Sequence, residues 1–142
     1  MTLFATNNVL VPVDFSEEAQ KALAETLEFV RDPSKLHAIH VLTPLEPMEP
    51  GVVWQTIDNQ DRIDKVTEAF YNRFSDEAYK AIKFTVKIGN PSSEIIDYAQ
   101  HNDIDLIVIP SSGRTGLQRF FLGSVAERVV RFSHCPVLVL RK

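Results

Sequence analysis

Cysteine is almost absent from this chain, whose 142 residues include only one, Cys135. A single cysteine excludes an intramolecular disulfide framework and any zinc site built on several cysteines. No apolar run approaches the roughly 18 residues that a membrane-spanning helix requires. Residues 1–8 contain no Lys or Arg and no apolar block typical of a signal peptide. We therefore expect a cytoplasmic protein that does not enter a membrane, in which Cys135 is buried and unreactive.

Glycine and proline are also scarce, with 5 and 8 residues. So few of them exclude a collagen-like chain and argue against a disordered one. Hydrophobic residues make up 44% of the chain and charged residues 24%, as in ordinary globular domains. A chain of this length suits a single domain with its own core, and we expect one domain over residues 1–142.

The charges are distributed unevenly along the chain. The net charge is −4, but residues 110–142 contain six basic residues and one acidic residue. The acidic remainder argues against duplex DNA or RNA as the partner, because nucleic acids require a broad basic face. The basic segment could serve a small anion such as a nucleotide phosphate. The alternative is that its arginines are ordinary solvated surface residues.

Short apolar runs alternate with helical patterns along the whole chain. We predict strands at residues 9–13, 36–42, 83–88, 105–109 and 136–140. We predict helices from Ser16 to Arg31, from Asp58 to about Tyr79, from Ser92 or Ser93 through Ala99, and from Ser124 to about Phe132. Ser16 is the expected N-cap of the first helix, and Ser92 or Ser93 that of the third.

This alternation is typical of an α/β fold with a five-stranded parallel sheet and helices on both faces. Ligands of such sheets bind beyond the carboxyl ends of the strands, where the strand order reverses. The rule points to Val13 and Asp14 after the first strand, and to Pro110 and Ser111 after the fourth.

The segment from Pro110 to Ser124 has the features of a phosphate cradle. Gly113, Gly116 and Gly123 permit close backbone approach, and the helix that follows offers unpaired N–H groups to an anion. Arg114 or Arg119 could add a charge-assisted contact. The alternative is a glycine-permitted turn in which Ser124 acts only as an N-cap. Neither the P-loop pattern nor the GxGxxG fingerprint occurs in the chain.

The chain resembles the universal stress protein family from its start to its end. The similar segments are Val11-Pro-Val-Asp-Phe-Ser16, His40-Val41, the stretch from Ile109 to Val125, and Cys135-Pro-Val-Leu-Val-Leu140. Nucleotide-binding members carry G-x2-G-x9-G-[S/T], and Gly113, Gly123 and Ser124 match its latter part. Pro110 stands where the first glycine is expected, and proline removes an N–H donor from that position.

The resemblance implies a Rossmann-like or flavodoxin-like strand order 3-2-1-4-5 and a homodimer formed through strand 136–140. It also implies an adenine nucleotide, ATP or ADP with or without Mg²⁺, with Asp14 and the Val41 backbone at the adenosine end. Gly113, Gly123, Ser124 and Val125 would surround the phosphates. The candidate binding residues are Val13, Asp14, Val41, Pro110, Ser111, Gly113, Arg114, Gly123, Ser124 and Val125.

Other chemistry-bearing residues give weaker signals. Asp14 could serve as a general base, a Mg²⁺ ligand, an adenosine contact or an ordinary turn residue. The four histidines lack metal-binding spacing, and His40 is expected to be a packed core residue. No GxSxG nucleophile motif occurs, and we assign no catalytic or metal-binding residue. Trp54, in the proline-rich stretch, could cover a pocket or a partner.

The sequence therefore favours a cytoplasmic, homodimeric, ATP-binding stress-response sensor or regulator with slow or no ATP hydrolysis. Its protein partner is not identified by the sequence. The alternative is a dimeric interaction protein of the same fold that has lost nucleotide binding because of Pro110. A third hypothesis is an enzyme of another nucleotide-binding α/β family.

Overall fold

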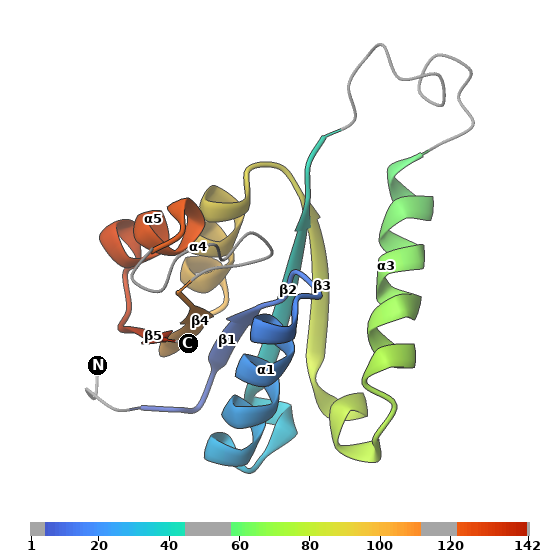
Figure 1. The fold of residues 1–142 in the computed structure, drawn as a ribbon, viewed down its shortest axis with the longest axis horizontal. Coiled ribbons are helices and arrows are strands. Elements are labelled where there is room, and N and C mark those ends of the chain that lie inside the picture. Colours follow the sequence, from blue (N-terminus) through green and yellow to red (C-terminus); the bar gives the residue numbers. More distant parts are fainter. Residues whose placement is uncertain (1–4, 45–57, 112–121, 142) are drawn as a thin grey trace.

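The computed structural model describes residues 5–44, 58–111 and 122–141. Its strands form one parallel sheet in the order β3-β2-β1-β4-β5 (Figure 1). The α/β fold and the strand order are therefore confirmed. The strands are β1 (Val9–Pro12), β2 (Leu36–Leu42), β3 (Lys83–Ile88), β4 (Leu106–Pro110) and β5 (Val137–Leu140). The helices are α1 (Glu17–Val30), α3 (Asn59–Arg73), α4 (Pro91–His101) and α5 (Ser124–Phe132), with short 3₁₀ turns η1 (Pro33–Lys35) and η2 (Glu77–Ala81).

Both faces of the sheet are covered by helices. Along β1, Val9 and Val11 pack against the cluster that contains residues of α1 and α3, whereas Leu10 packs against the cluster that contains residues of α4 and α5. This alternation follows from the two-residue period of a strand. Figure 1 shows α4 and α5 together on one side of the sheet and α3 beside β3. The complete burial of Val9, Leu10 and Val11 explains why β1 is an unbroken apolar run.

The helix starts confirm one predicted cap and correct another. Ser16 caps α1 as predicted, since its hydroxyl accepts a hydrogen bond from the Ala19 N–H at 3.1 Å. The prediction of Ser92 or Ser93 for α4 was wrong, because Asn90 is the cap and accepts from the Ser93 N–H at 3.1 Å. Asparagine caps as well as serine does, and a proline after it suits the first helical position.

Helix α3 is shorter than predicted. It ends at Arg73, with Phe74 as its C-cap, and the chain then forms the separate turn η2 before β3. The ring of Phe74 is buried and packs against Tyr79 at 4.9 Å between centroids. The packing of buried Phe74 against half-buried Tyr79 therefore favours a bend at Ser75-Asp76 over one continuous helix, and Ser and Asp are common turn residues.

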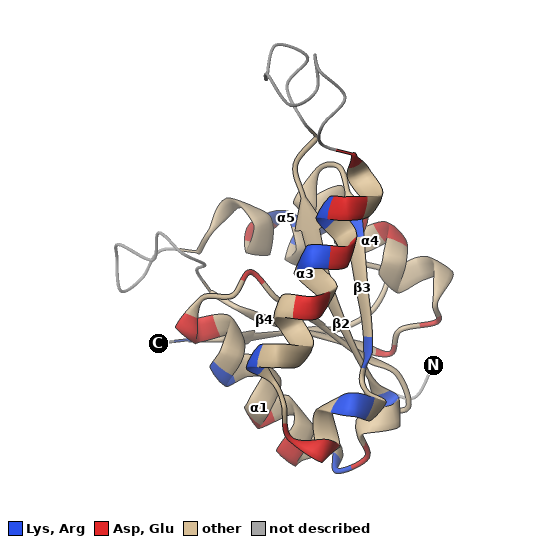
Figure 2. Cartoon of the chain, turned by 90° about the vertical axis from the view of Figure 1, so that its right-hand side faces the viewer, with Lys and Arg blue, Asp and Glu red and all other residues tan. Residues whose placement is uncertain are grey.

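The surface of α3 mixes acidic and basic residues (Figure 2). Asp61, Arg62, Asp64 and Lys65 alternate in sign within its first two turns. This helix therefore does not form the basic stripe that nucleic-acid binding requires. None of the helices in the described parts of the chain combines the length and the apolar character needed to cross a bilayer.

Candidate functional site

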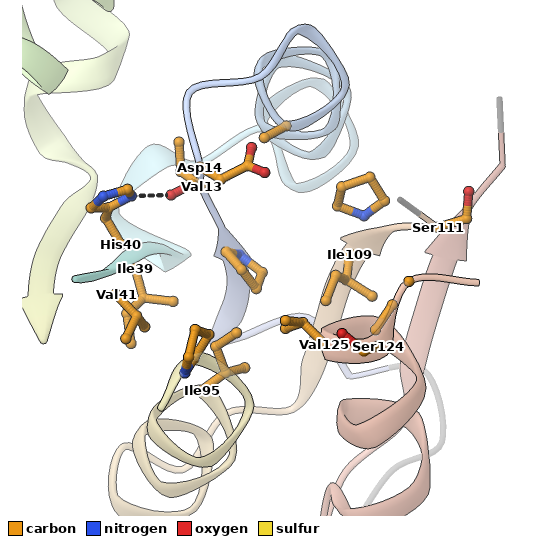
Figure 3. A pocket seen from close by; sticks show the side chains of 16 residues that line it. Val13, Asp14, Ile39, His40, Val41, Ile95, Ile109, Ser111, Ser124 and Val125 are labelled. Carbon is orange, nitrogen blue, oxygen red and sulfur yellow. Dashed lines mark hydrogen bonds between the residues drawn. The ribbon is translucent and has the colours of Figure 1, made fainter. Parts of the chain in front are cut away.

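A cavity of about 390 Å³ opens between the carboxyl ends of β1 and β4. These two strands pair only through Val9–Leu106 and Leu10–Ile107, and beyond those pairs they separate. Figure 3 shows residues of β1 and β2 on one side of the cavity and residues of β4 and α5 on the other. The cavity therefore lies at the point where the strand order reverses, which is where α/β sheets bind ligands.

Eight of the ten predicted site residues line this cavity. They lie in or directly beside four elements, β1, β2, β4 and α5: Val13, Asp14, Val41, Pro110, Ser111, Gly123, Ser124 and Val125. Gly113 and Arg114 lie outside the described residues, as does Trp54. The structure thus brings together segments that are separated by up to about a hundred positions in the sequence.

Two prolines explain why the strands separate here. The Val13 N–H donates to the Ile39 carbonyl on β2, and the Ser111 N–H donates to the Leu140 carbonyl on β5, at 2.7 and 2.8 Å. Because successive residues of a strand direct their nitrogens to opposite sides, Pro12 and Pro110 direct theirs into the crevice. Neither proline has an N–H group, so neither can extend the β1–β4 ladder.

Asp14 is both a turn residue and a cavity residue. Its Oδ1 accepts hydrogen bonds from the Ser16 N–H at 3.0 Å and from the Ser16 hydroxyl at 2.5 Å. The intervening Phe15 has a φ of 63°, in the left-handed region. Asp14 therefore acts as a turn residue through one carboxylate oxygen, and this role is compatible with the ligand contacts that the sequence left open.

The start of α5 forms another part of the cavity wall. The N-cap is Gly123, whose N–H donates to the Ser111 carbonyl at 2.7 Å, and no side chain caps the helix. Ser124 is the first helical residue, so the alternative in which it acts as the N-cap was wrong. The next backbone N–H groups of this first turn lack intrahelical partners and carry partial positive charge. Such a helix start is suited to an anionic ligand.

The two histidines of β2 have different environments. His40 is half-buried and lines the cavity, so the prediction of a packed core histidine was wrong for it. His37 is the buried one, and its Nδ1 lies 2.7 Å from the Tyr98 hydroxyl. Burial lowers the pKa of His37, and the charge of Lys83 lowers it further. Because His37 and His40 are three residues apart and side chains of a strand alternate, their rings lie on opposite faces of the sheet.

Cys135 is buried as predicted. Burial raises the pKa of its thiol, against the opposing effect of a hydrogen bond from Ser133. A thiol with a raised pKa is a poor nucleophile. Within residues 5–44, 58–111 and 122–141, no three His, Cys, Asp or Glu side chains gather in a way that could hold a metal ion.

Two of the described arginines of the carboxyl-terminal segment do not line the cavity. Arg131 on α5 pairs with Glu127 one turn away, on the exposed side of the helix. Arg141 lines a different groove together with residues of α1 that include Glu17 and Glu25. These two arginines match the alternative of solvated surface residues rather than phosphate ligands.

Sequence reasoning missed the contribution of α4. Pro91 and Ile95 line the cavity from the helix that follows β3, together with Ile39 of β2. The apolar stripe that includes Ile95 predicts a buried helix face. Which part of that face reaches a ligand depends on how α4 crosses the sheet, and no local pattern encodes this.

Comparisons with known proteins agree with this geometry. The sequence model described as the universal stress protein family matches residues 5–141. A universal stress protein of Methanocaldococcus jannaschii is 31% identical over 143 residues, which cover 94% of this chain and 81% of that protein. The solved structure of the universal stress protein UspA from Lactobacillus plantarum superposes with a TM-score of 0.74 at 30% identity, covering 96% of this chain and 98% of that one.

A universal stress protein family protein of Arabidopsis thaliana with AMP bound has the same fold. Its TM-score is 0.63 at 22% identity, and the match covers 96% of this chain and 92% of that one. At this identity the likeness establishes the fold only.

Proposed function

The chain belongs to the universal stress protein family, and on that premise we propose that it binds an adenine nucleotide, ATP or ADP, in the cavity between β1 and β4. The observation that carries the proposal is the arrangement of this cavity. It joins an apolar wall at the end of β2 to the start of α5, which has no side-chain cap. A nucleotide has the matching distribution of polarity, with a flat aromatic base at one end and anionic phosphates at the other.

The cavity fits such a ligand in size and chemistry. Its volume of about 390 Å³ lies within the range of roughly 300–1,000 Å³ that is usual for small-molecule sites. Ile39, Val41 and Ile95 provide apolar surface for the base, and Asp14 provides an acceptor for ribose hydroxyls. A protein of the same fold has AMP bound, and the cavity of this chain lies at the strand ends where such folds bind ligands.

We assign the phosphates to the start of α5. Gly123, Ser124 and Val125 would bind them through backbone N–H groups and the Ser124 hydroxyl, with Ser111 beside them at the end of β4. Gly113 and Arg114 complete the proposed set, because they lie in sequence between Ser111 and Gly123. Asp14 is the one carboxylate among the described lining residues. Mg²⁺, when it accompanies the nucleotide, would therefore be held mainly by phosphate oxygens and water.

The proposed role is that of a nucleotide-dependent stress sensor or regulator in the cytoplasm, with slow or no hydrolysis. Efficient phosphoryl transfer requires several groups around the transferred phosphate, including metal ligands and a group that orients water. The described lining residues include one carboxylate and one histidine, His40, whose Nδ1 already contacts the Val13 carbonyl. This set favours binding over catalysis.

A homodimer is part of the proposal. β5 is the last strand of the sheet and pairs only with β4 among the described strands. Leu138 on β5 is 47% exposed, and Phe132 at the end of α5 is 57% exposed. A second copy would cover the free strand edge and this apolar surface.

A second candidate function is a dimeric interaction protein that binds no nucleotide. Pro110 favours it, because the proline nitrogen faces the crevice where an N–H donor would otherwise meet a ligand. The two functions predict different outcomes in one experiment. The protein is titrated by calorimetry with AMP, ADP and ATP, with and without Mg²⁺, and with GTP as the control.

We expect weak binding of adenine nucleotides, in the micromolar range or looser, and weaker binding of GTP. Absence of binding at millimolar adenine nucleotide, both in the parent protein and in Pro110→Gly, would refute the nucleotide proposal and leave the interaction protein.

A further inference from the structure

The turn between β1 and α1 has a backbone conformation that its sequence does not favour. Phe15 has a φ of 63°. This left-handed region suits glycine, and a bulky aromatic residue there is an outlier. A residue persists in such a conformation only when its surroundings hold it in place. Contacts from outside the turn must therefore stabilise it.

Those contacts come from His40 on the neighbouring strand β2. Its Nδ1 lies 2.6 Å from the Val13 carbonyl oxygen, and its ring packs against Phe15 with 5.0 Å between centroids. Figure 3 shows the His40–Val13 hydrogen bond at the edge of the cavity. One side chain thus contacts the residues on both sides of Asp14.

The hydrogen bond fixes the tautomer of His40. A carbonyl oxygen only accepts hydrogen bonds, so Nδ1 carries the hydrogen and donates it. Histidine in water favours the opposite tautomer, with the hydrogen on Nε2.

Asp14 depends on the same turn. Its Oδ1 is used by the Ser16 N–H and hydroxyl, and the Ser16 hydroxyl in turn caps α1. The direction of the carboxylate into the cavity is therefore set by the backbone of residues 13–16. A change in φ at Phe15 would turn Asp14 away from the cavity wall.

We propose that His40 is a positioning residue, which holds the left-handed turn at Phe15 through its Nδ1–H bond to Val13 and its ring contact, and so presents Asp14 to the ligand. This inference rests on the proposed nucleotide site for its effect on binding. The effect on the turn itself does not depend on any ligand, and the two can be measured separately.

The test compares three variants with the parent protein. His40→Leu keeps an apolar side chain but removes the donor, whereas His40→Asn keeps an N–H donor close to the position of Nδ1. His101→Leu is the matched control, because the Nδ1 of His101 also lies 2.7 Å from a backbone carbonyl, that of Asp97. His101 is exposed and ends α4, whose first residue lines the cavity.

We expect His40→Leu to weaken AMP and ADP binding about tenfold, as for the loss of about one hydrogen bond. The Ser16 amide donates a hydrogen bond to Asp14, and its hydrogen should exchange with solvent about tenfold faster in the same variant. His40→Asn should restore most of both values, and His101→Leu should change neither. Nitrogen-15 NMR of the parent should show His40 with its hydrogen on Nδ1.

The proposal is overturned if His40 carries its hydrogen on Nε2, or if His40→Leu leaves both nucleotide affinity and Ser16 exchange at the parent values. The NMR measurement needs no variant, so a His40→Leu protein that fails to fold leaves the proposal testable. If the parent binds no nucleotide, the proposed function fails. The tautomer of His40 and the exchange rate of the Ser16 amide then still show whether His40 holds the turn.

Discussion

The hydroxyl of Tyr98 on α4 lies 2.7 Å from Nδ1 of His37 on β2, and both side chains are buried. The Nε2 of His37 lies 3.3 Å from Oδ1 of Asn8, whose Nδ2 donates to the Asp103 carbonyl. That amide orientation makes Oδ1 an acceptor, so Nε2 carries the hydrogen and Nδ1 accepts from Tyr98. Burial raises the pKa of the Tyr98 hydroxyl, which keeps it protonated as a donor. The network is satisfied by the neutral form of His37.

The stability of the protein should therefore fall at acidic pH. The pKa of His37 is lowered in the folded state from its ordinary 6.5. Below that value the unfolded chain binds more protons than the folded one, so the free energy of unfolding decreases as pH falls and levels off below the folded-state pKa. Urea denaturation between about pH 7.5 and about pH 5.5 measures this slope.

The control for this prediction is His37→Gln, which removes the titrating group. The variant should be less stable at neutral pH because it disrupts the buried network, and its stability should depend less on pH. An identical slope in the parent and in His37→Gln would show that other groups cause the pH dependence.

The start of α5 gives a prediction about phosphate binding. Gly123 has φ −58° and ψ 153°, a conformation that any residue can adopt. Gly123→Val therefore introduces bulk into the cavity wall without backbone strain, and we expect it to abolish nucleotide binding. Ser124→Ala should weaken binding by roughly 1.5–3 kcal/mol, as for one hydrogen bond to a charged group. Calorimetry measures the affinity of both variants, and Val130→Ala on the exposed side of α5 is the control.

Unchanged ATP affinity in Gly123→Val would show that the start of α5 does not bind the nucleotide.

Pro110 gives a prediction in the opposite direction. Pro110→Gly restores an N–H group that faces the crevice, and a bond to a charged oxygen is worth about 1.5–3 kcal/mol. The same substitution makes the unfolded chain more flexible, which lowers the free energy of unfolding by about 0.4–1 kcal/mol. We expect tighter ATP and ADP binding, by about tenfold or more, in a slightly less stable protein. Parallel titration and thermal unfolding separate the two effects, and equal or weaker affinity in the glycine variant would contradict this account of Pro110.

The free edge of β5 gives a prediction about assembly. Leu138 is 47% exposed, whereas Val139 packs against the core cluster of α4 and α5. Leu138→Glu should therefore place a charge in the proposed interface with little effect on the core, and should shift the dimer toward the monomer. Sedimentation equilibrium measures the mass, and Phe29→Glu, at another exposed apolar side chain, on α1, is the matched control. A parent protein that remains monomeric at all concentrations would rule out the dimer.

The sequence by itself determined the elements of the fold. Apolar runs predict β1, β2, β4 and β5, because strands inside a parallel sheet have apolar residues facing both helix layers. The alternating pattern of residues 83–88 predicts β3. Ser16 also predicts the start of α1, since its hydroxyl acts on a backbone N–H three residues away. The strand order came from the family resemblance, because periodicity does not encode which strands are neighbours. The cap at Asn90 and the end of α3 at Arg73 depended on competing local signals and were predicted wrongly.

The tertiary structure decided which residues share the cavity. Val13, Ser111 and Gly123 could be placed at element ends from the sequence, but Ile95 reaches the cavity only through the packing of α4 across the sheet. The sequence predicted a packed core position for His40 and none for His37, although both belong to one strand. Only the folded sheet puts His37 under α4 and His40 beside Phe15. Side-chain environment is a property of non-local contacts, and these form between segments that no local pattern relates.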